Sequence, residues 1–318
     1  MKKTALEKIA ATVRAGLTAS PKRLPPWLLY DEAGSRFFEQ ITELPEYYLT
    51  RTERGIFQRH APAMIAAAAQ NVRLRIAELG AGSADKTRLL LAAAIERQGS
   101  VLYEPIDVST SALQAAKIRI EAELPGVRVA PLVEDYTHSL LLEPHSGEQR
   151  RLILYIGSSI GNFDPFEAAA LLRQIRSALA PGDSLLLGVD LVKAKSILLP
   201  AYDDAAGVTA AFNLNLLARL NRELGANFVP GSFAHRALWN RQESRMEMHL
   251  VSLDQQSVYI AALDLIADFA AGESIHTENS YKYQPGQAEE ALRAAGFEPE
   301  KTWTDEQGWF AVVLAQAS

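Results

Sequence analysis

The sequence predicts an α/β fold, in which a mostly parallel β-sheet is covered by helices and is accompanied by a second, α+β domain. Short apolar segments alternate with amphipathic segments between residues 74 and 192. The alternation stops near residue 193, and apolar segments return after residue 286. Strands that alternate with helices are typical of βαβ units, whose strands run parallel and whose connections are right-handed.

The N-terminal part of the chain has mostly helical patterns. Residues 1–55 contain two loop-like stretches, "SPKRLPP" and "LPEYYLTRTE", and residues 56–70 form a helix that leads into the first strand. Beyond it, the alternation predicts strands at 74–79, 101–108, 127–135, 151–157 and 183–192, with helices at 85–98, 110–124 and 165–179.

A different pattern follows the last of these strands. Residues 193–240 look helical and loop-like, and "SRMEMHLVSL" and "SVYIAALDL" then predict two antiparallel strands joined by the polar link "DQQ". After Pro285, a helix and a strand–turn–strand segment complete the first sheet. We therefore expect one domain from residues 56–192 and 283–318, and a cap domain from 1–55 and 193–282. In open α/β sheets, ligands bind at the carboxyl ends of the strands, so a cap there would enclose a site.

The composition is that of an ordinary globular protein. The 318 residues are 48% hydrophobic with a formal net charge of −6, whereas nucleic-acid-binding proteins are usually basic. The chain has no cysteine, which removes disulfides and thiolate chemistry and fits a cytoplasmic protein. Charged residues interrupt the N-terminal segment, and every uninterrupted apolar run is short. We therefore expect neither a signal peptide nor a membrane span.

The stretch "ELGAGSADK" places a glycine turn between a strand and a helix. Gly80 and Gly82 lack the third glycine of a dinucleotide-binding turn, so the turn suits a nucleoside better than a pyrophosphate. Asp107, at the end of the second strand, is placed to bind ribose hydroxyls. Asp135 and Tyr136, after the third strand, are placed to bind the edge and the face of an adenine. This order of groups suits S-adenosylmethionine, and a tight turn that merely requires glycine is the alternative.

Six motifs in order carry a family resemblance: "DEAGSRFFEQITELPEYYLTRTE", "ELGAGSADKTRLLL", "YEPIDVS", "YIGSSIGNFDP", "AYDDAAGVTAAFNLN" and "HTENSYKY". Together they resemble the L-histidine Nα-methyltransferase family of ergothioneine biosynthesis, over residues 20–315. The resemblance implies a Rossmann-like class I methyltransferase sheet with a second, α+β substrate-binding domain. It also implies S-adenosylmethionine as the cofactor and conversion of L-histidine to its Nα-trimethylated betaine, hercynine. Relatives that methylate other amino acids, including tryptophan, share the fold.

The resemblance also implies a role for each matching position. The cofactor positions are Gly80, Lys86, Asp107, Asp135 and Tyr136. Asn162 and Tyr202 match residues that hold the carboxylate and the amino end of the substrate. Tyr30 matches a tyrosine near the amino group, so Asn162 and Tyr30 are the candidate catalytic residues. The residues that match the side-chain pocket are Tyr47, Met248, Glu278, Asn279 and Ser280.

The chemistry of methyl transfer is consistent with these residue types. The attacking nitrogen must be neutral and aligned with the methyl carbon, and a nearby sulfonium lowers the pKa of an ammonium. Neutral polar residues such as Asn162 therefore suffice around it. For an imidazole, Glu278 can accept from one ring N–H, and Ser280 or Tyr47 can donate to the other nitrogen. Positions 278 and 280 share one face of a strand. An indole has only a donor, which favours histidine over tryptophan.

Two other interpretations stay open. One is the same fold acting on another amino acid, tryptophan first, and the other is a non-catalytic module that binds S-adenosylmethionine. The six histidines lack a metal-binding spacing such as HExxH, so we expect no metal. His276 lies beside the proposed substrate strand and is interpreted as an ordinary strand histidine, with support of the substrate residues as the alternative. The expected partner is a small-molecule amino acid, with no nucleic acid, no membrane and a monomeric protein.

Overall fold

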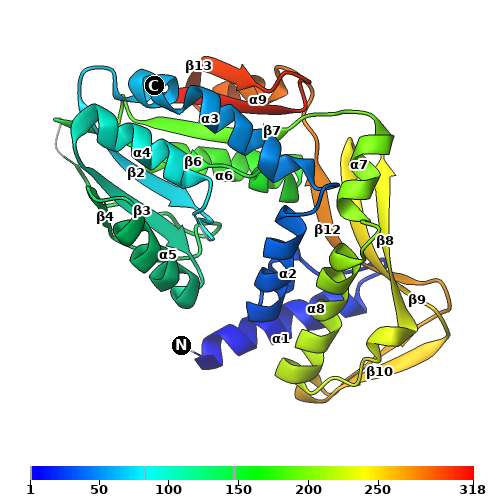
Figure 1. Ribbon diagram of the computed structural model, residues 1–318. Coiled ribbons are helices and arrows are strands. Elements are labelled where there is room, and N and C mark those ends of the chain that lie inside the picture. Colours follow the sequence, from blue (N-terminus) through cyan, green and yellow to red (C-terminus); the bar gives the residue numbers. More distant parts are fainter. Residues whose placement is uncertain (1, 83, 146–147) are drawn as a thin grey trace. The chain divides into compact units, whose positions relative to one another are not determined.

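The computed structural model describes residues 2–82, 84–145 and 148–318, and the chain divides into two compact units (Figure 1). The first unit is formed by Met1–Tyr48 and Lys193–Tyr281, and the second by Leu49–Val192 and Lys282–Ser318. The boundaries between the units lie after residues 48, 192 and 281. The boundaries expected from the sequence lie after residues 55, 192 and 282. In the described ranges, no helix is both long enough and apolar enough to cross a membrane.

The second unit contains the larger sheet, which has eight strands in the described part of the chain. Its order is β13-β14-β7-β6-β2-β3-β4, and β5 also pairs with β3. The strands are β2 (Arg73–Leu79), β3 (Val101–Asp107), β4 (Val127–Val129), β5 (Leu132–Val133), β6 (Gln149–Tyr155), β7 (Ser184–Asp190), β13 (Phe297–Thr304) and β14 (Phe310–Ala317). The pairs among β2–β7 are parallel, and β14 runs antiparallel to both β7 and β13. This confirms the predicted parallel sheet and its C-terminal strand–turn–strand.

Helices cover both faces of this sheet. They are α3 (Tyr48–Ala69), α4 (Thr87–Gln98), α5 (Thr110–Glu123), α6 (Pro165–Ser177) and α9 (Gln287–Ala294). Helices α3, α4 and α5 share one hydrophobic core with the sheet, and α6 and α9 share a second core on the opposite face. Along β2, Ile76 belongs to the first core and Ala77 to the second. The central strands are apolar on both faces because both are covered.

The first unit is built around a four-stranded sheet in the order β1-β12-β9-β8. These strands are β1 (Lys22–Arg23), β8 (Phe233–Asn240), β9 (Arg245–Ser252) and β12 (Ser274–Tyr281), and β10 (Gln256–Ile260) and β11 (Leu265–Phe269) form a separate hairpin. The helices are α1 (Lys2–Thr18), α2 (Glu32–Thr42), α7 (Lys195–Tyr202) and α8 (Val208–Leu224). Short 3-10 helices occur at η1 (Pro26–Leu29), η2 (Ser159–Asn162, in the second unit), η3 (Pro230–Ser232) and η4 (Ala261–Leu263).

Two expectations for the first unit are wrong. The segments "SRMEMHLVSL" and "SVYIAALDL" do not pair with each other, because β9 lies between β8 and β12 and β10 pairs with β11. Strand β8 lies in a stretch that was expected to be helical or loop-like. Of its residues, only Phe233 and Ala237 are buried, so β8 lacks the two-residue periodicity that identifies a half-buried strand.

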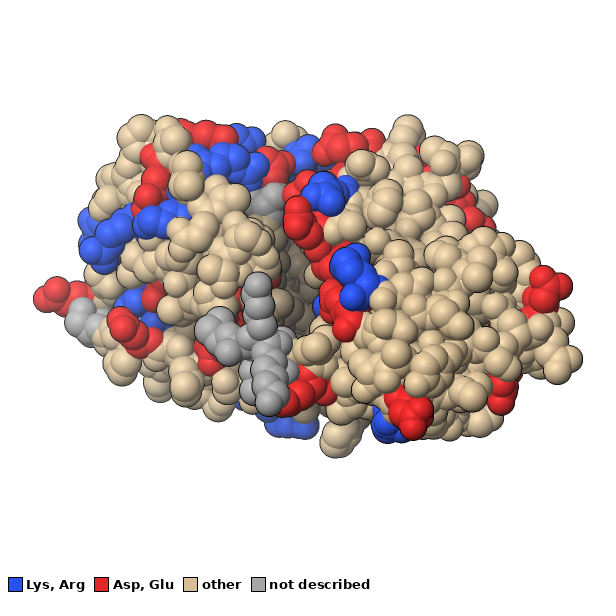
Figure 2. Space-filling model, turned by 90° about the horizontal axis from the view of Figure 1, so that it is seen from below, with Lys and Arg blue, Asp and Glu red and all other residues tan. Residues whose placement is uncertain are grey.

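Charged side chains of both signs occur on the surface. The chain has 32 lysines and arginines against 38 aspartates and glutamates, so the two signs nearly balance. On the face that Figure 2 shows, basic and acidic side chains are interspersed across a largely neutral surface.

Candidate active site

The predicted cofactor residues of the second unit lie at the carboxyl ends of neighbouring parallel strands. Gly80 follows β2 directly, Asp107 is the last residue of β3, and Asp135 and Tyr136 follow β5. Because β3 pairs in parallel with both β2 and β5, these strand ends lie at the same edge of the sheet. This is the edge where ligands bind in open α/β sheets.

The glycine turn leaves open space at this edge. The N–H of Gly80 donates to the carbonyl of Ile106 at 2.9 Å, which fixes the turn against β3. Gly80 and Gly82 have φ angles of +67° and +49°, which lie in a backbone region that residues other than glycine rarely adopt. A Cβ atom on Gly80 would lie 3.3 Å from the hydroxyl of Tyr136, whereas a Cβ on Gly82 would meet nothing within 4 Å. The turn therefore allows a ligand to approach the backbone closely.

The two acidic side chains are held in place by their own loops. One oxygen of Asp107 accepts from the backbone N–H of Ser109 at 2.9 Å, and the other lies 3.5 Å from the N–H of Gly82. Asp135 accepts from the hydroxyl of Thr137 at 2.5 Å. Carboxylates that are oriented in this way can accept hydrogen bonds from the hydroxyls of a ribose or the amino group of an adenine.

Tyr136 supplies an aromatic ring beside these acids. Its ring packs edge-to-face on Tyr155, with 5.9 Å between the ring centroids, and its carbonyl accepts from the side chain of Gln174 at 2.6 Å. Burial raises the pKa of Tyr136 to about 12, so its hydroxyl remains protonated at neutral pH. A fixed ring beside a glycine turn and two acids fits the adenosine part of S-adenosylmethionine.

Lys86 contributes to this site through the loops that it holds. Its ammonium, at the start of α4, forms an ion pair with the fully buried carboxylate of Glu53 on α3. Glu53 also accepts from the N–H of Gly157, after β6, at 2.8 Å. Gly157 has a φ of +78°, and a Cβ there would lie 3.1 Å from the ammonium of Lys86, so both the backbone conformation and the close contact favour glycine. Glu53 is the last residue of the motif "DEAGSRFFEQITELPEYYLTRTE", but it was not singled out from the sequence because nothing in the motif marks this glutamate as buried.

A second buried acid, Glu78, lies on β2 just before the glycine turn. Both of its carboxylate oxygens are 2.8 Å from the hydroxyl of Thr87, and the hydroxyl of Tyr103 donates to one of them. Burial raises the pKa of Glu78 to about 7, although the two hydroxyl contacts lower it. Glu78 therefore titrates near neutral pH. An acidic residue just before a glycine turn, at the end of a strand, was the signal that could have found it.

Asn162 ends the short helix η2, which follows β6 at the same edge of the sheet. The loop before it is fixed by Ser158, whose hydroxyl accepts from the N–H of Asp190 at 2.9 Å. The carbonyl of Ser158 accepts from the N–H of Gly161, also at 2.9 Å. Asn162 is half-buried, and it belongs to the same unit as the cofactor residues.

Four of the predicted substrate residues lie together in the first unit. Glu278 on β12 is paired in register with Met248 on β9, and both side chains are buried. Ser280, two residues further along β12, is also buried, and the hydroxyl of Tyr202 donates to it at 2.8 Å. The carbonyl of Tyr202 is itself 2.8 Å from Nε2 of His235. The structure therefore brings a carboxylate, two hydroxyls and a thioether to one face of the sheet.

Tyr30 and Tyr47 belong to an aromatic group of the same unit. The ring of Phe38 lies between them, with centroid distances of 5.5 Å to Tyr30 and 6.2 Å to Tyr47. Phe212 of α8 contacts Tyr30 at 5.4 Å. Tyr47 is buried, whereas 39% of the surface of Tyr30 is exposed. Tyr30 therefore combines a packed ring with access to the surface.

The side chain of Asn279 points away from Glu278 and Ser280. The pairing of β12 with β9 shifts its register between His276 and Glu278, and Thr277 and Glu278 are both buried as a result. Beyond this bulge, Asn279 lies on the opposite face, where its side-chain oxygen is 2.9 Å from Nε2 of His276. The structure therefore does not bring Asn279 to the face that holds the other predicted pocket residues.

Comparisons with known proteins give matches that cover most of the chain. Residues 9–317 match the family model described as "Histidine-specific methyltransferase, SAM-dependent". The chain is 47% identical to a histidine N-alpha-methyltransferase of Mycolicibacterium smegmatis, over 98% of this chain and 96% of that one. It is 44% identical to a protein of the same name from Mycobacterium tuberculosis, over 95% and 93%. It is 31% identical to "Ergothioneine biosynthesis protein 1" of Neurospora crassa, over 89% of this chain and 32% of that one.

The family model matches nearly the whole chain. The matched part contains the glycine turn, the two acids and the aromatic ring whose arrangement fits S-adenosylmethionine. The protein is an S-adenosylmethionine-dependent N-methyltransferase, and its chain belongs to the family of SAM-dependent, histidine-specific methyltransferases.

Proposed function

We propose that the protein methylates the α-amino nitrogen of L-histidine three times in succession and releases hercynine, the Nα-trimethylated betaine. The observation that carries the proposal is the buried pair of Glu278 and Ser280 on one face of β12. An imidazole has one N–H donor and one acceptor nitrogen, and a carboxylate with a hydroxyl matches both. A buried pocket with one acceptor and one donor for the ring strongly disfavours an amino acid whose side chain leaves either pocket group without a hydrogen-bond partner.

The second unit supplies the methyl donor. Asp107 would hold the ribose hydroxyls, and Asp135 and Tyr136 the adenine, while the turn at Gly80 lets the ligand approach the backbone. When bound, S-adenosylmethionine supplies a methyl group on a sulfonium, whose carbon is open to in-line attack by an amine. The protein's part is positioning, which can account for a large share of the acceleration in such a displacement.

The amino end of the substrate would be held by Asn162, Tyr202 and Tyr30. The amide of Asn162 can donate to the carboxylate, and the hydroxyl of Tyr202 would do so by exchanging its bond to Ser280 for one to the substrate. The ammonium of the substrate must lose a proton to water before the first attack, and the nearby sulfonium favours that loss. The first and second transfers each leave a proton that is released in the same way. The third leaves a quaternary nitrogen, which the aromatic rings of Tyr30 and Tyr47 can accommodate by cation–π contact.

The experiment is mass spectrometry of the products formed from S-adenosylmethionine and an equimolar mixture of the twenty amino acids. We expect three added methyl groups on histidine and none on the others. Methylation of a different amino acid, tryptophan for example, would overturn the imidazole pocket while retaining the amino-end assignment. Binding of S-adenosylmethionine with no methylated amino acid would overturn the proposed activity.

A variant series tests the pocket itself. Glu278→Ala combined with Met248→Val should greatly reduce histidine turnover, because the acceptor for the ring N–H is lost. Glu243→Gln, on an exposed turn of the same unit, serves as the matched control and should behave as the wild type. Undiminished histidine turnover in the double variant would contradict the role of Glu278.

A further inference from the structure

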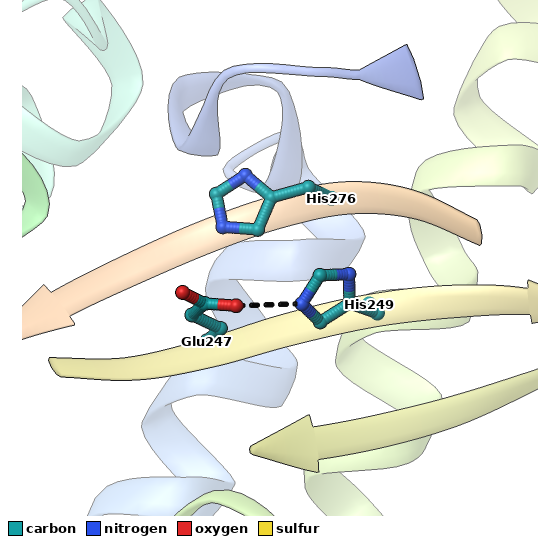
Figure 3. Close-up of side chains that lie close together, drawn as sticks. All are labelled: Glu247, His249 and His276. Carbon is teal, nitrogen blue, oxygen red and sulfur yellow. Dashed lines mark hydrogen bonds and ion pairs between the residues drawn. The ribbon is translucent and has the colours of Figure 1, made fainter. Parts of the chain in front are cut away.

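Three possible metal ligands converge on the half-exposed face of the sheet in the first unit (Figure 3). The carboxylate of Glu247 and the rings of His249 and His276 offer one ligand atom each, and these atoms all lie within 4.8 Å of one another. Nε2 of His249 is 3.1 Å from Oε2 of Glu247, and the two imidazole centroids are 5.0 Å apart. Residues of this kind at this separation need a separate explanation, because the proposed methyl transfer uses none of them.

Strand geometry explains why these side chains meet. Glu247 and His249 are two residues apart on β9 and therefore share a face, opposite to the buried face of Met248. His276 on β12 is directly paired with His249. The bulge at Thr277 keeps His276 on this face although Glu278, two residues later, lies on the other. The cluster is thus built into the pairing of two strands and does not depend on a mobile loop.

We propose that Glu247, His249 and His276 bind one divalent transition-metal ion of the zinc class. Imidazole and carboxylate are ligands that suit Zn²⁺ and Co²⁺, at ligand–metal distances of about 2.0–2.2 Å. Ligand atoms within 4.8 Å of one another need to move inward by only about 1 Å to reach this geometry. The site is distinct from the methyl-transfer residues, so the proposal does not rest on the proposed function.

Neighbouring side chains orient the carboxylate ligand. Oε1 of Glu247 accepts from Asn240 at 2.9 Å and from Arg245 at 2.8 Å, which directs Oε2 toward His249. Hydrogen bonds of this kind to a ligating carboxylate are a regular feature of metal sites. The side-chain oxygen of Asn279, 2.9 Å from Nε2 of His276, is a further oxygen at the site.

The charge of Arg245 sets the expected affinity. Its guanidinium lies beside Glu247 and opposes the approach of a dication, so we expect a dissociation constant in the micromolar range and not in the nanomolar range. A bound ion would link β9 to β12 on the face of the sheet opposite to the side chains of Met248 and Glu278. It should therefore stabilise the first unit against heat without being required for the reaction.

The experiment is a calorimetric titration of the tag-free, chelator-treated protein with ZnCl₂, in a buffer without histidine because free histidine itself binds zinc. Addition of Co²⁺ provides a second readout, since its visible absorption reports coordination by nitrogen and oxygen. We expect one ion per chain and a rise in the melting temperature. His249→Asn, His276→Asn and Glu247→Gln should each weaken binding at least tenfold.

Controls separate a built site from adventitious binding. His60→Asn, on α3 of the other unit, should bind zinc as the wild type does. Arg245→Gln removes the positive charge but keeps an N–H donor for Glu247 and leaves the contact from Asn240 in place, so it should bind zinc more tightly, a gain that misfolding would not produce. No saturable binding by the wild type at submillimolar zinc would overturn the proposal. Equal losses in His60→Asn and His276→Asn would also overturn it, because zinc would then bind histidines without regard to the cluster.

Discussion

Replacing Glu78 by glutamine should remove a pH-dependent loss of stability. Burial raises the pKa of this carboxyl from 4.5 to about 7, despite hydrogen bonds from Tyr103 and Thr87. Between these two pH values the folded protein retains a proton that the unfolded chain releases. The folded state is therefore favoured most below pH 4.5, and the contribution of Glu78 to the free energy of unfolding decreases as the pH rises to about 7.

The size of this decrease follows from the two pKa values. Each pH unit between them is worth about 1.4 kcal/mol, so the complete change from pH 4.5 to pH 7 is about 3 kcal/mol. Glutamine resembles the protonated carboxyl in shape and does not titrate. The difference in unfolding free energy between wild type and Glu78→Gln should therefore fall by about this amount across the window, while contributions from other groups cancel.

Urea unfolding of both proteins at several pH values between 4 and 8 measures this difference. Glu243→Gln, which removes an exposed carboxylate, is the control and should differ from wild type by a constant amount. A difference for Glu78→Gln that is constant over this range, or that grows in favour of the wild type as the pH rises, would refute the reasoning.

Three further predictions test the site. Gly80→Ala places a Cβ at a residue with φ +67°, 3.3 Å from the hydroxyl of Tyr136, so it should lower the free energy of unfolding by about 1–2 kcal/mol. It should also weaken S-adenosylmethionine binding measured by calorimetry, and unchanged binding would contradict the turn's role. Glu53→Gln should also weaken cofactor binding, and its effect should not add to that of Lys86→Met in a double-mutant cycle, because the two side chains form one ion pair. Tyr202→Phe should raise KM for histidine roughly fivefold to tenfold, with a smaller change in kcat, because a net hydrogen bond is worth about 1 kcal/mol; an unchanged KM in steady-state kinetics would remove this residue from the substrate contacts.

The parallel sheet could be predicted from the sequence because its signals are local. Apolar strands alternate with amphipathic helices, and Gly80, Asp107 and Asp135 each stand at the end of such a strand. Carboxyl ends of parallel strands meet at one edge, so the cofactor side of the site follows from the order of elements alone. The predicted placement of Glu278 and Ser280 on the same face likewise needs only the two-residue repeat of a strand.

The pairing of strands in the first unit was decided only by the tertiary structure. Strand β8 reaches β9 through a short turn, but the other neighbour of β9 is β12, which follows the β10–β11 hairpin, so this second pairing depends on contacts between segments that are far apart in the chain. Sequence spacing therefore missed the cluster of Glu247, His249 and His276, since β12 brings its histidine opposite one on β9. The bulge at Thr277 is the decisive detail. Without that extra residue His276 would share a face with Glu278, because side chains on a regular strand alternate strictly between its two faces.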